Sequence, residues 1–387
     1  GRVSTAGFFA GFFLVFSFLI PRPLLALDVT SGDGIILYGD TKRLNSGLFY
    51  PATIKVWKNG APTNGDALLF YGDRSSTPQY KDYSYTNNNF GGDNDTLSEN
   101  IPVTVKMETN PTKEEAIEGY VNTSGTLQIL CYDGSSWSEE WSATVGGSGG
   151  STRFDIAFER NSGDALITYS TNTGTTNELA YRTKAGSDSC GSGNWSSEST
   201  FDPVRTSGVV QWVEMASDYR SAQNIIGAIW ADTNSDLSGA IWNGSAWVNE
   251  PAAVMNAALE VVSTAQDVKS FDIDFEASTG DVMVTYGSGG TATTNGAFYR
   301  ACPIGGSGNA SDCTWGAQTA ITSMADDATN LDISSDPNTD DIVFASIGNA
   351  GSDMQAAYWN GTSWSGTANI DATSATPVAG SQMISTG

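Results

Sequence analysis

Apolar and polar residues alternate along most of this chain in short runs separated by turn residues, and helical periodicity is almost absent. The best-ordered run begins at Phe154 and reads FDIAFERNSGDALITY. It returns 117 residues later, from Phe271, as FDIDFEASTGDVMVTY, with nine of sixteen positions identical and no gap. Each copy has the pattern of two short strands joined by a turn, so we predict a chain built from repeated β units.

A third strand follows in each unit and gives the clearest alignment. The aligned segments are LQILCYDG (127–134), LAYRTKAG (179–186), LSGAIWNG (237–244) and MQAAYWNG (354–361). Three of the four end in Asp-Gly or Asn-Gly, which favours two-residue type I′ hairpin turns. An aromatic residue after the turn is expected to open a fourth strand in successive units: Trp137, Trp195, Trp247, Trp315 and Trp364.

Four short antiparallel strands in roughly fifty residues make one blade of a β-propeller. We therefore predict an all-β fold, a β-propeller of four-stranded antiparallel blades, with about six to seven blades. The first strand of each blade is expected to be the innermost one. The repeats are assigned to residues 27–373, and residues 374–387 are expected to begin a further blade that the chain does not complete.

Residues 1–26 differ from the repeats. They contain the apolar run FFAGFFLVFSFLI at 8–20, and the small residue Ala26 precedes a polar sequence. A run of this length is typical of a secretory signal peptide. A retained N-terminal anchor is the alternative, although a spanning helix needs about 20 apolar residues. We expect a secreted or cell-surface protein whose mature domain has no stable membrane insertion.

The charge and histidine content exclude several classes of function. Asp and Glu total 43 against 18 Lys and Arg, for a formal net charge of −25. Such a surface repels phosphate backbones, so nucleic acid is not an expected partner. The chain has no His, which is the commonest general base at neutral pH and the commonest transition-metal ligand. An extracellular glycan or a surface protein is the expected partner.

The four cysteines fit an oxidising compartment. Cys302 and Cys313 bracket the loop CPIGGSGNASDC, where the repeat needs a hairpin, so a local disulfide is predicted there. Cys131 and Cys190 lie in neighbouring repeats, and the sequence leaves their pairing open.

An acidic segment near the last repeat is the best metal candidate, with Asp336, Asp340 and Asp341 as ligands. Its start resembles a calcium loop, but it lacks the glycine at the sixth place and the bidentate Glu at the twelfth. The alternative is an acidic variant of the hairpin turn used in the other repeats. No cofactor is expected, with weak Ca²⁺ binding at this segment as the exception.

Aromatic and arginine side chains on the third strands are candidates for binding a sugar, because aromatic rings offer flat apolar faces. The candidates are Tyr181, Arg182, Trp242, Tyr299, Arg300 and Trp359. Packing within the blade core is the alternative for Trp242 and Trp359.

The sequence gives less support for a catalytic site than for a sugar-binding one. Asp155 and Glu159 on one first strand are repeated as Asp272 and Glu276 on another. This repetition favours a structural role, because a glycosidase needs its carboxylate pair once. A sialidase-like site would need arginines on the innermost strands to clamp a carboxylate, and only Arg153 lies on one. No catalytic residue is predicted.

The units resemble the blade repeats of secreted bacterial β-propeller proteins, in which a strand ending W-N-G-x-x-W turns into the outermost strand. The segments IWNGSAW (241–247) and YWNGTSW (358–364) carry this resemblance. The units are also distantly similar to the Asp-box hairpins of sialidase-type propellers, although YDGSSW (132–137) departs from D-x-G-x-x-W. Their similarity to fungal fucose-binding six-bladed lectins is comparably loose. The resemblance implies a propeller and leaves the activity open.

These patterns together predict a non-catalytic binding or adhesion module, with carbohydrate as the candidate ligand. One alternative is an extracellular glycan-acting hydrolase or lyase of sialidase-like architecture. Another is a structural repeat within a larger surface protein.

Overall fold

A computed structural model describes the larger part of the chain between residues 52 and 371. The described residues are 52–56, 66–72, 77–84, 87, 89–97, 100–147, 151–203, 207–220, 222–260, 269–289, 296–304, 310, 313–321, 324, 327–348, 354–365 and 368–371. The chain divides into two units, Gly1–Ile36 and Leu37–Gly387, and all described residues belong to the second. The predicted signal peptide and the predicted further blade lie outside the described residues. Within the described part, no helix has the length and apolarity needed to cross a membrane.

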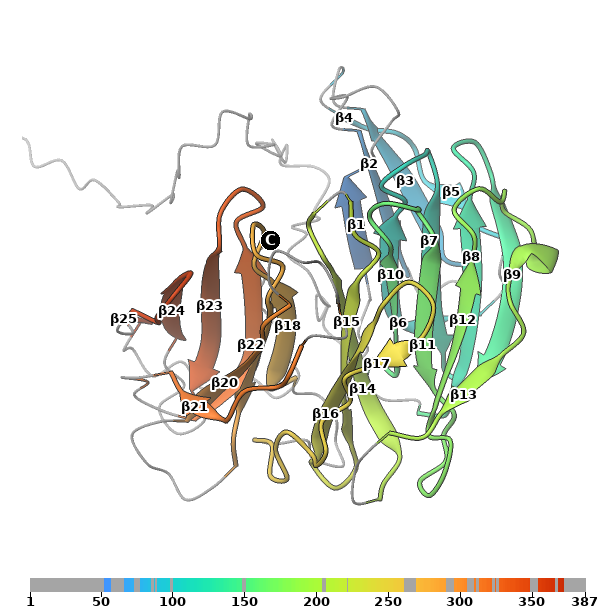
Figure 1. The fold of residues 1–387 in the computed structure, drawn as a ribbon. Helices are drawn as coiled ribbons and strands as arrows, with labels where there is room; N and C mark the ends of the chain where they lie inside the picture. The colour runs from blue at the N-terminus through green and yellow to red at the C-terminus, as the bar shows by residue number, and fades with distance from the viewer. Residues whose placement is uncertain are drawn as a thin grey trace, which may run out of the picture. The chain divides into compact units, whose positions relative to one another are not determined.

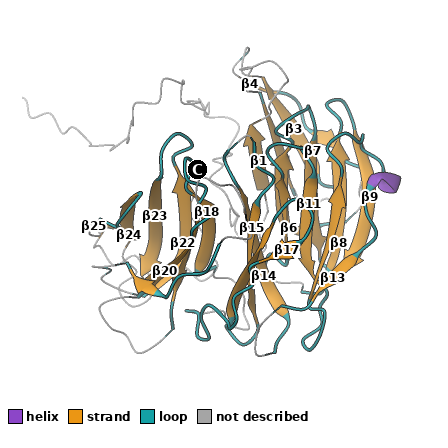
Figure 2. Cartoon of the chain, viewed as in Figure 1, coloured by secondary structure: helices purple, strands orange, loops and turns teal. Residues whose placement is uncertain are grey.

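The described residues form six β-sheets, which we number 1–6 in chain order (Figure 1). Five sheets contain four antiparallel strands in sequence order, and sheet 1 adds a short strand, β5, that pairs with β3. Figure 2 shows how little helix accompanies them. The one helix among the described residues is the 3-10 helix η1 (Ser192–Asn194). The predicted all-β fold of four-stranded blades is confirmed.

The first three sheets occupy the N-terminal half of the described chain. Sheet 1 comprises β1 (Ala52–Val56), β2 (Ala67–Tyr71), β3 (Gln79–Ser84), β4 (Asn89–Phe90) and β5 (Asn94–Asp95). Sheet 2 comprises β6 (Pro102–Thr109), β7 (Ala116–Asn122), β8 (Thr126–Tyr132) and β9 (Trp137–Thr144). Sheet 3 comprises β10 (Phe154–Phe158), β11 (Ala165–Ser170), β12 (Leu179–Lys184) and β13 (Ser199–Phe201).

The last three sheets follow with the same strand order. Sheet 4 comprises β14 (Val210–Ser217), β15 (Ile226–Asp232), β16 (Leu237–Trp242) and β17 (Trp247–Val248). Sheet 5 comprises β18 (Phe271–Phe275), β19 (Val282–Gly287), β20 (Ala297–Cys302) and β21 (Thr319–Ala320). Sheet 6 comprises β22 (Ala328–Ser335), β23 (Asp341–Gly348), β24 (Met354–Asn360) and β25 (Ala368–Asp371).

The sixteen-residue repeat folds as the same hairpin in sheets 3 and 5. Phe154 pairs with Tyr169 in one copy, and Phe271 pairs with Tyr286 in the other. The strands β10, β11, β18 and β19 are buried along their whole length, including the aspartates Asp155, Asp272 and Asp274. In the turn of the second copy, Gly280 has a φ of 73°, a left-handed conformation that glycine adopts without steric cost.

The turn after the third strand differs from the predicted one. Trp242 pairs with Trp247 across a four-residue loop, so the two-residue type I′ turn is wrong. Within this loop only Gly244 has a positive φ, of 89°. The Oδ1 atom of Asn243 accepts hydrogen bonds from the backbone N–H of Ser245 at 3.1 Å and of Ala246 at 2.9 Å. This side-chain acceptor closes the loop, and the same bonds recur at Asp133 and Asn360.

The sheets are neighbours through their first strands. Contacts join β1 to β6, β6 to β10, β10 to β14, β14 to β18 and β18 to β22. The first strand of each sheet is therefore the innermost, as the repeat order predicts. Apolar side chains fill the spaces between sheets; Ile129, Phe154 and Ile167 lie in one such cluster between sheets 2 and 3. The arrangement is that of a β-propeller.

Candidate functional site

Two glutamate–tryptophan contacts connect neighbouring sheets at repeat-equivalent positions. The Nε1–H of Trp242, at the end of β16, donates to Oε1 of Glu159 at 2.8 Å. The Nε1–H of Trp359 on β24 donates to Oε1 of Glu276 at 2.6 Å. Burial raises the pKa of both glutamates. Trp242 and Trp359 are only 4% and 7% exposed, so the structure places both indoles in the core between sheets.

The other predicted sugar-binding residues are divided between different interfaces. Tyr181 on β12 packs against Trp242 of the next sheet with ring centroids 5.5 Å apart, and Tyr299 packs against Trp359 at 5.6 Å. Arg182 lies on the opposite face of β12 from Tyr181, because side chains alternate along a strand. Two tyrosine–tryptophan pairs are therefore brought together, and they join sheet 3 to sheet 4 and sheet 5 to sheet 6.

Three arginines, one of them directly before an innermost strand, make contacts in different parts of the protein. The guanidinium of Arg182 lies 4.9 Å from the ring centroid of Trp141 in sheet 2. Arg300 donates to the backbone oxygens of Gly316 at 2.8 Å and Met255 at 2.9 Å. Arg153 donates to Oε1 of Gln211 at 2.6 Å. These side chains stabilise three different parts of the fold, which is not the arrangement of an arginine clamp.

The repeated aspartates of the first strands bind backbone groups of the following sheet. Oδ2 of Asp155 accepts from the N–H of Met215 at 2.7 Å, and Oδ2 of Asp272 accepts from the N–H of Ile333 at 2.9 Å. The two contacts are equivalent in the repeat. They support the structural interpretation of these acids.

Charged side chains on and beside the innermost strands also form a continuous network. Lys106 Nζ lies 2.9 Å from Glu214 Oε2 and 3.8 Å from Asp155 Oδ2. Lys269 Nζ lies 3.3 Å from Asp272 Oδ1 and 3.7 Å from Glu214 Oε1. Burial raises the pKa of Asp155 and of Asp272. The lysines supply the opposite charges that buried carboxylates require.

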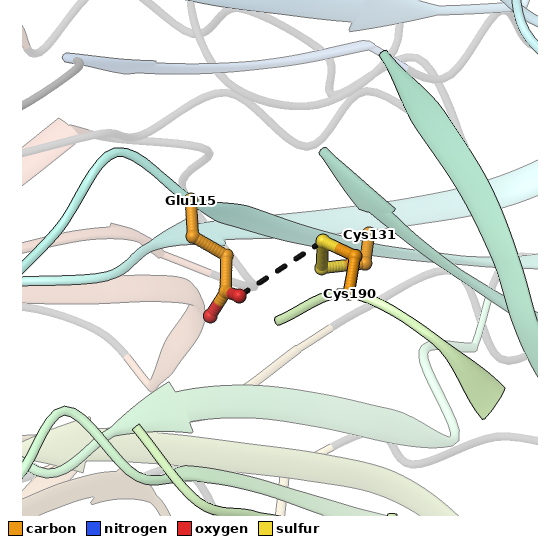
Figure 3. A group of neighbouring side chains, drawn as sticks. All are labelled: Glu115, Cys131 and Cys190. Atoms are coloured by element: carbon orange, nitrogen blue, oxygen red, sulfur yellow. Dashed lines mark hydrogen bonds between the residues drawn. A yellow bond between two sulfur atoms is a disulfide. The ribbon is translucent and has the colours of Figure 1, made fainter. Parts of the chain in front are cut away.

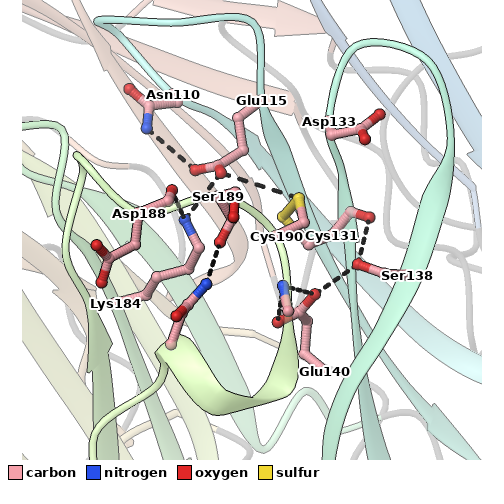
Figure 4. The surroundings of a disulfide bond; sticks show 12 residues. Asn110, Glu115, Cys131, Asp133, Ser138, Glu140, Lys184, Asp188, Ser189 and Cys190 are labelled. Carbon is pink, nitrogen blue, oxygen red and sulfur yellow. Dashed lines mark hydrogen bonds and ion pairs between the residues drawn. A yellow bond between two sulfur atoms is a disulfide. The ribbon is translucent and has the colours of Figure 1, made fainter.

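A disulfide joins Cys131 on β8 to Cys190 in the loop between β12 and β13, across 59 residues. Figure 3 shows Glu115 beside this disulfide, and among the described residues these three are the one group of potential metal ligands that converge. Bonded sulfurs are not thiolates, so the group is a poor metal site. Glu115 instead binds Lys184 Nζ at 2.8 Å (Figure 4). The second disulfide pairs Cys302 with Cys313.

The predicted metal residues bind groups of the protein. Oδ1 of Asp340 accepts from the backbone N–H of Ser278 at 2.8 Å and of Thr279 at 3.1 Å in sheet 5. Oδ1 of Asp336 accepts from the N–H of Asn338 at 2.9 Å. Asp341 begins β23. These contacts fit the acidic-hairpin alternative, and Ca²⁺ binding here stays a prediction.

A pocket of about 460 Å³ lies between sheets 1 and 2. Its volume falls within the range of roughly 300–1,000 Å³ that is usual for small-molecule sites. Sheet 1 supplies the start of β2, the end of β3 and the β4 region, and sheet 2 supplies the turn before β7 and the end of β8. The lining residues are Asp66, Ala67, Leu68, Asp82, Tyr83, Ser84, Asn87, Asn89, Phe90, Gly91, Glu114, Tyr132 and Gly134.

The residues of sheet 2 that line the pocket occupy the same repeat positions as Trp242 and its neighbours in sheet 4. Tyr132 aligns with Trp242 at the end of the third strand. Glu114 packs beside Gly134 as Asn224 packs beside Gly244. A phenol therefore stands here in the place of the indole. None of the residues that line the pocket was among the sugar-binding residues predicted from the sequence.

The pocket wall combines aromatic and acidic groups. The rings of Tyr83 and Phe90 lie 5.1 Å apart on the sheet 1 side. Tyr83 and Tyr132 are only 4% and 8% exposed, whereas Phe90 is partly exposed. Asp66, Asp82 and Glu114 supply carboxylates, and among the described residues no lysine or arginine lines the pocket. Partial burial and the neighbouring Asp66 raise the pKa of Asp82. The pocket therefore offers many hydrogen-bond acceptors and a negative charge.

No protein-family model matches the chain, and no curated protein matches its sequence. Solved structures do match its fold. The BP39L lectin from Burkholderia pseudomallei is 12% identical, with a TM-score of 0.53 over 83% of this chain and 84% of the lectin. At this identity the likeness establishes the fold alone.

Two further structures match with lower scores. A fungal lectin from Aleuria aurantia, a six-bladed β-propeller that recognises fucose, is 15% identical with a TM-score of 0.41, over 81% of this chain and 93% of the lectin. An ulvan lyase, a polysaccharide lyase, is 13% identical with a TM-score of 0.46, over 84% of this chain and 83% of the lyase.

Proposed function

We propose that this protein is a secreted or cell-surface, non-catalytic β-propeller that binds carbohydrate in the pocket between sheets 1 and 2. The carrying observation is a cavity of about 460 Å³ between two blades whose lining combines the partly exposed ring of Phe90 with carboxylate and amide groups. A sugar ring has an apolar C–H face and a rim of hydroxyl groups. Such a ligand uses both kinds of wall, because aromatic rings pack on the face while polar side chains bind the hydroxyls.

Two further observations support the proposal. The lectin from Burkholderia pseudomallei shares the fold, and lectins bind carbohydrate. The two disulfides, Cys131–Cys190 and Cys302–Cys313, fit an oxidising compartment such as the cell exterior. Trp242 and Trp359 are assigned to packing, so the pocket replaces them as the proposed contact surface.

A glycan array and a pull-down with surface polysaccharides, using residues 27–387, test the proposal. The key variant is Phe90→Ala, which removes an aromatic wall. The matched control is Leu97→Ala, because Leu97 is 60% exposed and is not among the pocket residues. We expect Phe90→Ala to weaken sugar binding by about tenfold, equivalent to about 1.4 kcal/mol, and Leu97→Ala to leave it unchanged. Absence of binding to every sugar and surface polymer would overturn the carbohydrate function.

A further inference from the structure

The first strands of sheets 2–6 carry a charged residue at one shared position. This position stands three residues before the end of each strand and is occupied by Lys106, Asp155, Glu214, Asp272 and Asp332. We call it the inner charged position. The residue after it is held by the preceding sheet at two interfaces, where Asp155 accepts from Met215 N–H and Asp272 accepts from Ile333 N–H. Neighbouring first strands therefore meet in the same register at both interfaces.

The residue after the inner charged position also packs on the second strand of the preceding sheet. The residue that it covers there pairs with the residue two places after the inner charged position of that sheet. The packed pairs are Ile156 with Ile117, Met215 with Leu166, and Ile333 with Met283. Sheet 4 has Gly227 at the covered place, and Ile273 fills the space where a side chain would project. An Ile or Met side chain therefore covers this place at four successive interfaces.

Sheet 6 leaves the same place exposed. Val343 pairs with Ser334, two residues after Asp332, so it is equivalent to the covered residues of the earlier sheets. Those of sheets 2, 3 and 5 are buried, whereas Val343 is 42% exposed. The next residue, Phe344, lies in the cluster shared with sheet 5, so Val343 points away from sheet 5. An exposed apolar residue at a place that other sheets bury favours a docked segment.

The C-terminal residues, which lie outside the described part of the chain, have the spacing and sequence of a first strand. The inner charged position lies 11, 13 and 12 residues after the end of the preceding fourth strand in sheets 3, 4 and 6, and sheet 5 follows a longer connection. Gln382 lies 11 residues after Asp371, where β25 ends. The next residues, Met-Ile-Ser (383–385), match Met-Ala-Ser (215–217) of β14. Met383 therefore takes the place after the inner charged position.

We propose that residues 378–385 dock on the side of β22 and β23 that faces away from sheet 5, as the first strand of a seventh sheet. Met383 packs on Val343, and its N–H donates to the carboxylate of Asp332. These contacts repeat those that Met215 and Ile333 make with the sheets before them. The inference does not depend on the proposed carbohydrate function.

The surroundings of Asp332 support this contact. Its Oδ1 lies 4.0 Å from Lys269 Nζ. The equivalent Asp155 has its Oδ2 3.8 Å from Lys106 Nζ, and the same atom accepts from Met215 N–H. One carboxylate at this position can therefore serve a lysine and the following strand together.

Thiol labelling of residues 27–387 tests the proposal. The Val343→Cys variant reports whether this place is covered, because the four native cysteines are bonded in disulfides and do not react. Its rate of reaction with a water-soluble maleimide is measured alone and together with Met383→Asp. The matched control is Ile384→Asp, which introduces the same charge on the opposite face of the docked strand. Leu97→Cys gives the rate at a site that is 60% exposed, and thermal unfolding confirms that each variant is folded.

We expect Val343→Cys to react at least about tenfold more slowly than Leu97→Cys, because a covered thiol is labelled only after local opening. Addition of Met383→Asp should restore fast labelling, and so should ending the chain at residue 373. Addition of Ile384→Asp should leave the rate low.

Fast labelling of Val343→Cys in the otherwise intact chain would overturn the proposal. Slow labelling that persists when the chain ends at residue 373 would also overturn it, because another part of the molecule would then cover Val343. Slow labelling that disappears on dilution would do the same, since it would point to a second copy of the chain. An equal rise in rate with Ile384→Asp and Met383→Asp would show that Met383 is not the residue that faces sheet 6.

Discussion

The indole N–H of Trp242 in sheet 4 donates to the carboxylate of Glu159 in sheet 3 at 2.8 Å, across 83 residues of sequence. Trp359 and Glu276 repeat the contact between sheets 6 and 5 at the same sequence separation. Each contact satisfies a buried donor and a buried acceptor at once. Removing one partner leaves the other without its hydrogen bond in the core.

The substitution Trp242→Phe is expected to destabilise the protein more than Trp247→Phe. Both changes remove a similar apolar volume, but the Nε1–H of Trp247 has no hydrogen-bond partner among the described residues. The free energy of unfolding, measured in urea, should fall by about 1–3 kcal/mol more for Trp242→Phe. Equal losses would show that the bond to Glu159 contributes no net stability.

The two disulfides are expected to differ in their contribution to stability. Cys131–Cys190 closes 59 residues and Cys302–Cys313 closes 11. By loop entropy the longer one contributes about 4 kcal/mol and the shorter one about 3 kcal/mol. One variant replaces both cysteines of the longer loop with alanine, and a second variant replaces both cysteines of the shorter loop. Denaturant unfolding of each variant measures how much free energy of unfolding its disulfide contributes. A larger loss from the shorter loop would contradict the loop-entropy explanation.

The substitution Asn243→Asp is expected to leave stability nearly unchanged. Asp133 makes the same side-chain bonds in sheet 2, from Ser135 N–H at 2.9 Å and Ser136 N–H at 2.8 Å. Asn243→Ala removes the acceptor and should cost about 1 kcal/mol. Thermal unfolding of the two variants compares them. A loss from Asp as large as that from Ala would show that the amide nitrogen matters.

Glu118 on β7 is fully buried, and both of its carboxylate oxygens lack a hydrogen-bond partner among the described residues. Its cross-strand neighbours are the apolar Met107 and Leu130, and burial raises its pKa well above the ordinary value. Sheet 3 has Ile167 at the equivalent position. We expect Glu118→Leu to raise the free energy of unfolding by about 1–3 kcal/mol.

The matched control is Glu118→Gln, which keeps an unsatisfied polar group at the same site. In the same denaturant titration, Glu118→Gln should raise the free energy of unfolding much less than Glu118→Leu does. A stabilisation equal to that of Glu118→Leu would point to the charge alone rather than to the missing hydrogen bonds.

Asp274 is expected to make stability fall as pH rises. Burial raises its pKa to about 6, and its Oδ2 accepts from Ser335 N–H at 2.8 Å. Because the folded pKa exceeds the unfolded value of about 3.9, the stabilisation is fully present below that value and is lost as pH rises through the folded pKa. Relative to Asp274→Asn, the native protein should lose roughly 3 kcal/mol at most between acid and neutral pH.

Denaturant unfolding at several pH values, with the exposed Asp202→Asn as a control, measures this difference. A constant difference between the native protein and Asp274→Asn across the range would show that the Asp274 pKa is not raised.

The sequence by itself determined the features that depend on neighbours along the chain. The hairpin from Phe154 to Tyr169 and its copy in sheet 5 follow from apolar periodicity and a glycine turn. The innermost place of the first strands follows from strand order in the repeat. The pairing of Cys302 with Cys313 was predictable because only one loop separates them. The four-residue loop at Asn243 was missed, because Asn-Gly also fits a shorter turn.

Only the tertiary structure decided which side chains meet between sheets. The sequence around an aromatic residue such as Trp242 does not show whether its ring faces a sugar or an adjacent sheet. Its hydrogen-bond partner, Glu159, lies 83 residues away. The packing of one sheet on the next also brings Cys131 to Cys190 and forms the pocket beside Tyr132. Local patterns specify which face of a strand is apolar, whereas the packing of one sheet on the next selects the residues that touch across it.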